Sequence, residues 1–422
     1  MPMRKRQLMK FAGGILLLAM VAWFGWNLYL DFVARAAAAA GRQYLRERRD
    51  ELAEAEFLRS LQRFPGDDEL RLLWAQAVIG GRSRDAVEAA NLALSGLQQI
   101  PDSSPFAAEC RMREGRLVLL VLHQPDRAEQ LLKRSIELDP KPLDAHYLLW
   151  KLYELTERHQ FAEPYFRAVW DRSPPAEHVT LLRDWYVSQF SPNAANAELD
   201  RRMGFLSAVN GGSGAAAVAR LATFQRSEPD SLLTRAINAS HLIQLRDRES
   251  ALPLLEEFQS LPAAKSSDFF LFVWVDLLLE LGRLPEAQAW FESYTGRREG
   301  YFFDRVSGRM EQIVYRRDRE AIEAFDRALA VWPGPADWSL LHFRAQSLGR
   351  LGKRVEADEA RSRAKVIESK MEIEVHKVLR RIIVRLDDPN VLRTMANFYR
   401  DLGRNWEADQ WSRLAAELPS AQ

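Results

Sequence analysis

Hydrophobic residues follow two different patterns along this chain. From Phe11 to Leu30, twenty residues run without a charged side chain, in the sequence FAGGILLLAMVAWFGWNLYL. From residue 34 onward, apolar residues instead recur three or four positions apart, in segments that end at turns such as LGR at 281–283. Spacing of three and four residues is the period of an amphipathic helix, and glycine commonly follows the last residue of one. The pattern predicts an all-α chain.

The uncharged run is long enough to cross a membrane. Twenty helical residues at about 1.5 Å each span roughly 30 Å, the thickness of the hydrocarbon core. Four basic residues precede it: Arg4, Lys5, Arg6 and Lys10. Trp23, Trp26 and Tyr29 lie in its far half, as is typical of a membrane interface. We therefore predict a basic flank at 1–10 and one N-terminal transmembrane helix at 11–30.

The basic flank also predicts an orientation. By the positive-inside rule, the chain is a single-pass membrane protein with a cytoplasmic N-terminus and a periplasmic or extracytoplasmic body. Five arginines that follow the run weaken this asymmetry, so the reverse topology stays open: Arg35, Arg42, Arg46, Arg48 and Arg49. Two other interpretations of the run are a signal peptide cleaved among the alanines near residue 36 and a buried helix.

The helical segments beyond the run share a longer repeat. In DREAIEAFDRALAVWP, Ala321, Phe325, Ala328 and Pro333 are spaced by 4, 3 and 5 residues. The same kind of spacing recurs elsewhere, in Ala53 and Phe57, in Ala128, Leu132, Ser135 and Pro140, in Ala162, Phe166 and Pro174, and in Ala287 and Phe291. This pattern resembles the second helix of a tetratricopeptide repeat (TPR). The resemblance implies a TPR-like α-solenoid of about ten helix-turn-helix units over residues 34–422.

Two stretches depart from the repeat period. Residues 177–197 and residues 366–386 are each predicted to add helix beyond what a repeat requires. Such additions bend a solenoid or form a local docking surface, whereas simple drift of a repeat sequence has neither effect.

Charge adds little to this picture. The first 50 residues carry nine Lys or Arg against three Asp or Glu, which leaves fifty basic and fifty-five acidic side chains for the rest of the chain. A mildly acidic body gives no electrostatic reason to expect binding to nucleic acid.

The sequence contains no recognisable catalytic or metal-binding motif. Its single cysteine, Cys110, excludes an intramolecular disulfide and any zinc or haem motif that needs several cysteines. No two histidines are spaced four residues apart, and the glycine-rich NGGSG at 210–214 lacks the Lys-Ser/Thr pair of a phosphate-binding loop. We therefore expect a protein that is not an enzyme and has no cofactor.

The TPR resemblance implies where a partner would bind. In TPR proteins the first helix of each pair lines a concave groove, through its second, fifth, ninth and twelfth positions. That register assigns tentative partner-binding roles to eight residues: Phe269, Phe272, Phe303, Met310, His342, Gln346, Arg393 and Asn397. Ordinary packing between helices is the alternative for the phenylalanines. The spacing of Arg393 and Asn397 resembles part of the carboxylate clamp of chaperone-binding TPR domains.

Together these features predict a membrane-tethered scaffold that binds peptides or partner proteins in a concave groove, in envelope complex assembly or secretion. The alternatives are the same scaffold facing the cytoplasm and a non-catalytic regulatory subunit of a membrane enzyme or transporter. The two functional classes differ in whether several partners copurify or a single stoichiometric one does.

Overall fold

The computed structural model describes residues 3–190 and 213–418, and it describes their side chains except at residues 3–17, 213–216 and 373. Residues 191–197 of the first predicted insertion and 210–212 of the NGGSG turn lie outside the described residues. Within the described ranges the regular elements are twenty-two α-helices and two short 3-10 helices, with no strand. The chain divides into two compact units: unit 1 is Met1–Leu122 with Arg127–Ala145, and unit 2 is His123–Asp126 with His146–Gln422.

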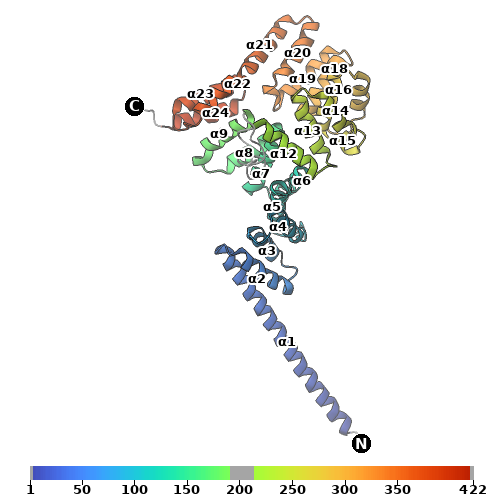
Figure 1. The fold of residues 1–422 in the computed structure, drawn as a ribbon, viewed down its shortest axis with the longest axis vertical. Helices are drawn as coiled ribbons and strands as arrows, with labels where there is room; N and C mark the ends of the chain where they lie inside the picture. Colours follow the sequence, from blue (N-terminus) through green and yellow to red (C-terminus); the bar gives the residue numbers. More distant parts are fainter. Residues whose placement is uncertain (1–2, 191–212, 419–422) are drawn as a thin grey trace. The chain divides into compact units, whose positions relative to one another are not determined.

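Unit 1 is built from helices that pack in consecutive pairs, as the ribbon in Figure 1 shows. Its elements are α1 (Met3–Arg46), α2 (Asp50–Arg63), α3 (Asp68–Gly80), α4 (Ala86–Leu97), α5 (Ala107–Leu120), α6 (Pro125–Leu138) and the start of α7 (Leu143–Leu155). The helices begin where the sequence supplies a cap. Asp67 Oδ1 accepts a hydrogen bond from the Leu70 backbone N–H at 3.0 Å, which satisfies a donor that the first turn of α3 would leave unpaired.

Unit 2 continues the same construction with more helices. After α7 come the 3-10 helix η1 (His159–Phe161), α8 (Glu163–Arg172), α9 (Pro175–Phe190), α12 (Ser213–Ser227), α13 (Leu232–Gln244), α14 (Arg248–Glu256), α15 (Pro262–Ser266), α16 (Asp268–Glu280) and α17 (Leu284–Glu292). The remaining elements are α18 (Tyr301–Ile313), α19 (Asp318–Ala330), η3 (Gly334–Ala336), α20 (Trp338–Arg350), α21 (Arg354–Lys370), α22 (Ile373–Ile382), α23 (Pro389–Asp401) and α24 (Asn405–Glu417).

The repeat positions read from the sequence are core positions. Ala321, Phe325 and Ala328 on α19 are fully buried and form one cluster with Leu340 of α20. A Cβ added at Gly308 on α18 would lie 2.4 Å from the Phe325 ring, and one added at Gly41 on α1 would lie 2.8 Å from the Phe57 ring. Small residues therefore let the two helices of a hairpin approach until an aromatic ring fills the space between them. The prediction of an all-α, TPR-like fold is confirmed.

The two stretches predicted to add helix are helical where the structure describes them. Residues 175–190 form α9, and residues 366–386 are divided between the end of α21 and α22, with a break at Met371 and Glu372. Neither stretch forms one long helix in the described residues.

The predicted localisation needs correction. Among the helices whose residues the structure describes, none is both long enough and apolar enough to cross a membrane. The run contains one polar residue, Asn27, and is followed directly by Asp31 and then by Arg35, and large apolar side chains between Leu18 and Phe32 are exposed. Arg63 of α2 donates hydrogen bonds to Asn27 Oδ1 at 3.0 Å and to Asp31 Oδ1 at 2.5 Å.

These polar contacts tie the end of the predicted transmembrane segment to a neighbouring helix. The localisation as a single-pass membrane protein, with a cytoplasmic N-terminus and a periplasmic or extracytoplasmic body, is overturned by this finding. The predicted anchor at 11–30 has no support in the structure, and the side chains of its residues 11–17 lie outside the described ones.

Candidate interaction groove

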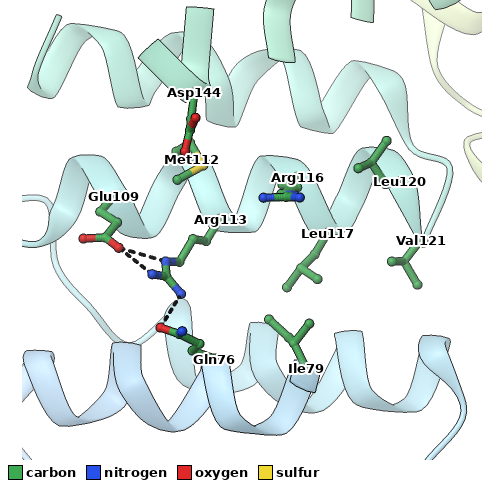
Figure 2. A pocket seen from close by; sticks show the side chains of 10 residues that line it. All are labelled: Gln76, Ile79, Glu109, Met112, Arg113, Arg116, Leu117, Leu120, Val121 and Asp144. Carbon is green, nitrogen blue, oxygen red and sulfur yellow. Dashed lines mark hydrogen bonds and ion pairs between the residues drawn. The ribbon is translucent and has the colours of Figure 1, made fainter. Parts of the chain in front are cut away.

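A pocket of about 510 Å³ opens on unit 1 where the first helices of successive hairpins meet (Figure 2). Its walls come from α3, α5 and the first turn of α7. The lining residues are Gln76, Ile79, Glu109, Met112, Arg113, Arg116, Leu117, Leu120, Val121 and Asp144. We call this surface the α3–α5 groove.

The floor of the α3–α5 groove is apolar. Met112 and Leu117 on α5 are only 9% and 6% exposed, and Ile79 on α3, which faces Leu117 in Figure 2, is 40% exposed. The opposite face of α5 is held against α6, because a Cβ added at Gly115 would lie 2.7 Å from Leu132. The groove therefore presents apolar side chains on a helix that is fixed from behind.

The charged side chains of the α3–α5 groove fall into two kinds. Arg113 is held in place: it donates to Glu109 Oε1 from Nε at 3.0 Å and from Nη2 at 2.6 Å, and to Gln76 Oε1 from Nη1 at 3.2 Å (Figure 2). Arg116 and Asp144 are exposed and make no hydrogen bond or ion pair within the described part of the chain. The groove thus offers one cation and one anion that a bound partner could pair.

Several residues of the α3–α5 groove also lie at the TPR groove positions of their helices. If Asp68 is taken as the first position of α3, the ninth and twelfth positions are Gln76 and Ile79. If Ala108 is the first position of α5, the second, fifth and ninth are Glu109, Met112 and Arg116. The TPR groove positions therefore line a pocket in unit 1 as well, although every predicted partner-binding residue lies in unit 2.

The eight predicted partner-binding residues all lie in unit 2 and differ in exposure. Phe269, Phe303 and Met310 are buried, Phe272 and His342 are half-buried, and Gln346, Arg393 and Asn397 are exposed. The structure brings Phe269 and Phe272 together on the Phe302 ring, at centroid distances of 5.8 and 5.1 Å. It does not bring the eight into one site. Their role in binding stays a prediction.

Helix α18 explains part of this difference. The helix begins at Tyr301, so its second, fifth and ninth positions are Phe302, Arg305 and Arg309 rather than residues one place later. Phe303 instead stacks on Phe291 and Tyr294 at the end of the preceding hairpin, at 5.7 and 5.9 Å. One residue along a helix is a rotation of about 100°, which is enough to turn a groove position into a packing position.

Arg305 and Arg309 belong to a network of buried charges on α16, α18 and the start of α20. Asp276 pairs with Arg309 at 2.8 Å and with Arg305 at 3.5 Å, and Arg305 also pairs with Asp337. Burial would lower the pKa of Arg305, but Asp337, Tyr301 and Asp276 raise it on balance. The two cations and two anions balance, so this network joins three first helices and leaves no net charge for a ligand.

Chemistry beyond binding finds little support in the described residues. No group of three or more His, Cys, Asp or Glu side chains there could hold a metal ion. Cys110 is fully buried on α5, and its thiol lies 3.2 Å from the Leu97 carbonyl oxygen. Burial raises the pKa of this thiol to about 12, which keeps it protonated and unreactive.

No protein-family model matches the chain, and no curated protein matches it in sequence. Several solved structures align with the chain at low identity and low TM-score. The APC/C hetero-tetramer Cut9–Hcn1 aligns over 93% of this chain and 80% of that one, with 13% identity and a TM-score of 0.35. Human IFIT1, as a dimer with PPP-AAAA, aligns over 80% of this chain and 96% of that one, with 14% identity and a TM-score of 0.33.

A tetratricopeptide repeat protein from Parabacteroides merdae aligns over 75% of this chain and 99% of that one, with 10% identity and a TM-score of 0.28. At identities this low the likeness concerns the fold alone.

Proposed function

We propose that this chain, whose helical hairpins form a TPR-like fold, is a non-catalytic interaction protein that binds a segment of a partner protein in the α3–α5 groove. The observation that carries the proposal is the groove itself. Three first helices converge on an apolar floor, and two charged side chains at its rim have no partner within the described residues. Repeat folds commonly bind partners on the concave surface that such helices form.

The composition of the groove suits a peptide segment better than a small molecule. Its floor offers aliphatic and thioether side chains, which accept apolar residues without demanding one shape. Arg116 and Asp144 would pair with oppositely charged side chains of the same segment. The fixed Arg113 guanidinium, already paired to Glu109 and Gln76, would act as part of the wall.

Photo-crosslinking tests this proposal directly. A photoreactive amino acid replaces Ile79 in the full chain, and the same substitution at Val87 on α4, which is 49% exposed, serves as the matched control. We expect a discrete partner adduct from position 79 and none from position 87. Equal labelling at both positions would refute the α3–α5 groove as the binding surface.

A second measurement separates the groove from general surface attraction. Once the crosslinked partner is identified, Ile79→Asp and Arg116→Glu should each weaken its binding by at least about tenfold, while Val87→Asp leaves the affinity unchanged. All variants should keep the wild-type melting temperature because these side chains are exposed. Unchanged affinity in both groove variants would contradict the proposal.

We also propose that the exposed members of the predicted set, Gln346, Arg393 and Asn397, contribute partner contacts on unit 2. Arg400 donates to Asn397 Oδ1 at 2.7 Å and Arg393 donates to Asn390 Oδ1 at 3.0 Å, so both arginines are oriented by amides on α23. Alanine at Arg393 and Asn397 should reduce partner binding without changing the melting temperature. Binding unchanged by both substitutions would remove this part of the proposal.

A further inference from the structure

The last hairpin of unit 2 packs against helices that precede it by more than 200 residues. Trp185 Nε1 of α9 donates to Glu407 Oε1 of α24 at 3.1 Å, and the Tyr399 hydroxyl of α23 donates to Gln189 Oε1 at 3.3 Å. The Tyr186 hydroxyl lies 3.0 Å from His376 Nδ1 of α22. Contacts between neighbouring repeats do not require such pairs, so they form a separate interface within unit 2.

A buried arginine lies at the centre of this interface. Arg404 is 6% exposed, pairs with Glu163 of α8 at 3.2 Å and with Glu407, and lies 3.5 Å above the Trp332 ring centroid. Burial lowers its pKa to about 10, and Glu163 counters part of that effect. Three segments that are far apart in sequence therefore meet at one guanidinium, and its removal would leave Glu407 buried without its cation.

Aromatic rings surround the buried arginine. Trp406 meets the rings of Phe166 and Trp170 at 6.1 and 5.4 Å, and Arg167 lies 4.4 Å above it. On the other side, Phe398 meets Phe190 at 5.1 Å. Rings at these distances are ordinarily worth more than their buried area alone, so α23 and α24 are held on α8 and α9 by a specific and largely apolar surface.

Helix α21 contacts the same hairpin through polar groups. Lys370 at the end of α21 pairs with Asp401 Oδ2 at 2.8 Å, with side chains 32% and 45% exposed, and Arg363 donates to the Asp401 carbonyl oxygen at 2.5 Å. These contacts are polar and partly solvated, and exposed ion pairs contribute little to stability. The ion pair with α21 therefore adds little, and the hairpin is held mainly by its aromatic contacts, with α8 and α9 and with the His376 ring of α22, which lies 5.8 Å from Phe398.

We propose that α23–α24 is a latch that closes unit 2 by docking on α8–α9, and that Arg404 locks it. The latch releases as one hairpin while the repeats from α12 to α21 stay folded, because most of its aromatic contacts and its hydrogen bonds to distant segments lie on α8 and α9. Its release removes Trp406 from the rings of Phe166 and Trp170 and separates Glu163 from Arg404. In the closed protein, Trp406 and Arg404 of the hairpin occupy the space beside these rings.

Native-state hydrogen exchange on the wild-type full chain is the first test. In low denaturant, amides of α8, α9, α23 and α24 should exchange through one shared opening that occurs at lower denaturant than the opening of α16–α21. If all of these helices opened with the same dependence on denaturant, unit 2 would unfold as a single body and the latch would be refuted.

A pair of variants then assigns the lock. Arg404→Ala should speed exchange in α8, α9, α23 and α24 by at least about tenfold and leave α16–α21 at the wild-type rate. Arg413→Ala, at an exposed arginine of the same hairpin, is the matched control and should leave every helix unchanged. Equal effects of the two substitutions, or faster exchange spread over all of unit 2 in Arg404→Ala, would overturn the role of Arg404.

Discussion

Single side chains set how closely the helices of this protein approach one another. Gly308 on α18 touches the Phe325 ring of α19, and no residue with a Cβ fits there without a shift of the ring. Gly349 on α20 meets only the end of the Arg361 side chain, at 3.5 Å from the position of an added Cβ. Both glycines lie in α-helices, but an added methyl group would clash with a neighbouring ring only at Gly308.

Gly308→Ala should therefore lower the free energy of unfolding by about 1–3 kcal/mol, the usual cost of overpacking a core. Gly349→Ala should leave it unchanged or raise it by up to about 1 kcal/mol, because alanine favours a helix. Urea denaturation of both variants measures the difference. Equal midpoints would show that the close contact at Gly308 contributes nothing.

The cysteine gives a second prediction at this scale. Burial raises the pKa of Cys110 to about 12, so the native thiol stays protonated at pH 8 and should not react with Ellman's reagent. It should react fully in guanidinium chloride. A Ser83→Cys variant, with its new thiol at an exposed turn position, is the control and should react in native protein. Rapid native labelling of the wild type would contradict this burial.

At the scale of the element, each helix needs a beginning that its own backbone cannot supply. Asp85 precedes α4, and its Oδ1 accepts hydrogen bonds from the Val87 and Glu88 backbone N–H groups, both at 2.9 Å. Without an acceptor these donors would be left to water.

Asp85→Ala should cost about 1 kcal/mol of stability. Asp85→Asn keeps an oxygen acceptor at the same place and should cost much less. Chemical denaturation distinguishes the two variants, and the cap would have no role if both lost the same stability.

Helix registers also decide which residues face a partner. The helices α3, α16, α20 and α23 begin at the first position of the groove register, whereas α5 and α18 each begin one residue before it. In α18 the offset puts Phe302, Arg305 and Arg309 at the groove positions, in place of a register that contained Phe303 and Met310. As a result, a network of paired charges occupies the face of α18 that was predicted to bind a partner.

At the scale of the whole molecule, the half-buried His159 links the stability of unit 2 to pH. Burial lowers the pKa of His159 from 6.5 to about 4, with Glu157 opposing the change. The folded state then binds this proton less tightly than the unfolded state does. The stability contribution is complete above pH 6.5 and is lost as the pH falls toward 4.

Acid should therefore destabilise unit 2 by up to about 3 kcal/mol through this residue, at roughly 1.4 kcal/mol for each pH unit. His159→Gln should flatten the dependence of the unfolding free energy on pH between 6.5 and 4. His342→Gln, at a half-buried site, should leave that slope as it is. A slope unaffected by His159→Gln would show that other groups carry the acid sensitivity.

The sequence by itself determined the helical class, the hairpin repeat and much of its core. Ala321, Phe325 and Ala328 could be assigned to the core in advance because a small, aromatic and small spacing depends only on the helical period and on side-chain size. The groove positions of α3 and α5 follow from the same local register and could have been assigned in advance too.

Only the tertiary structure decided what depends on contacts between distant segments. Arg404, Glu163 and Trp332 meet because unit 2 brings three separate segments together, and no local spacing records that meeting. Arg63 binds Asn27 and Asp31 across two helices, which the uncharged run at 11–30 did not reveal. The helical period of the sequence determines which face of each helix is apolar, whereas the course of the whole chain determines which distant segment packs against that face.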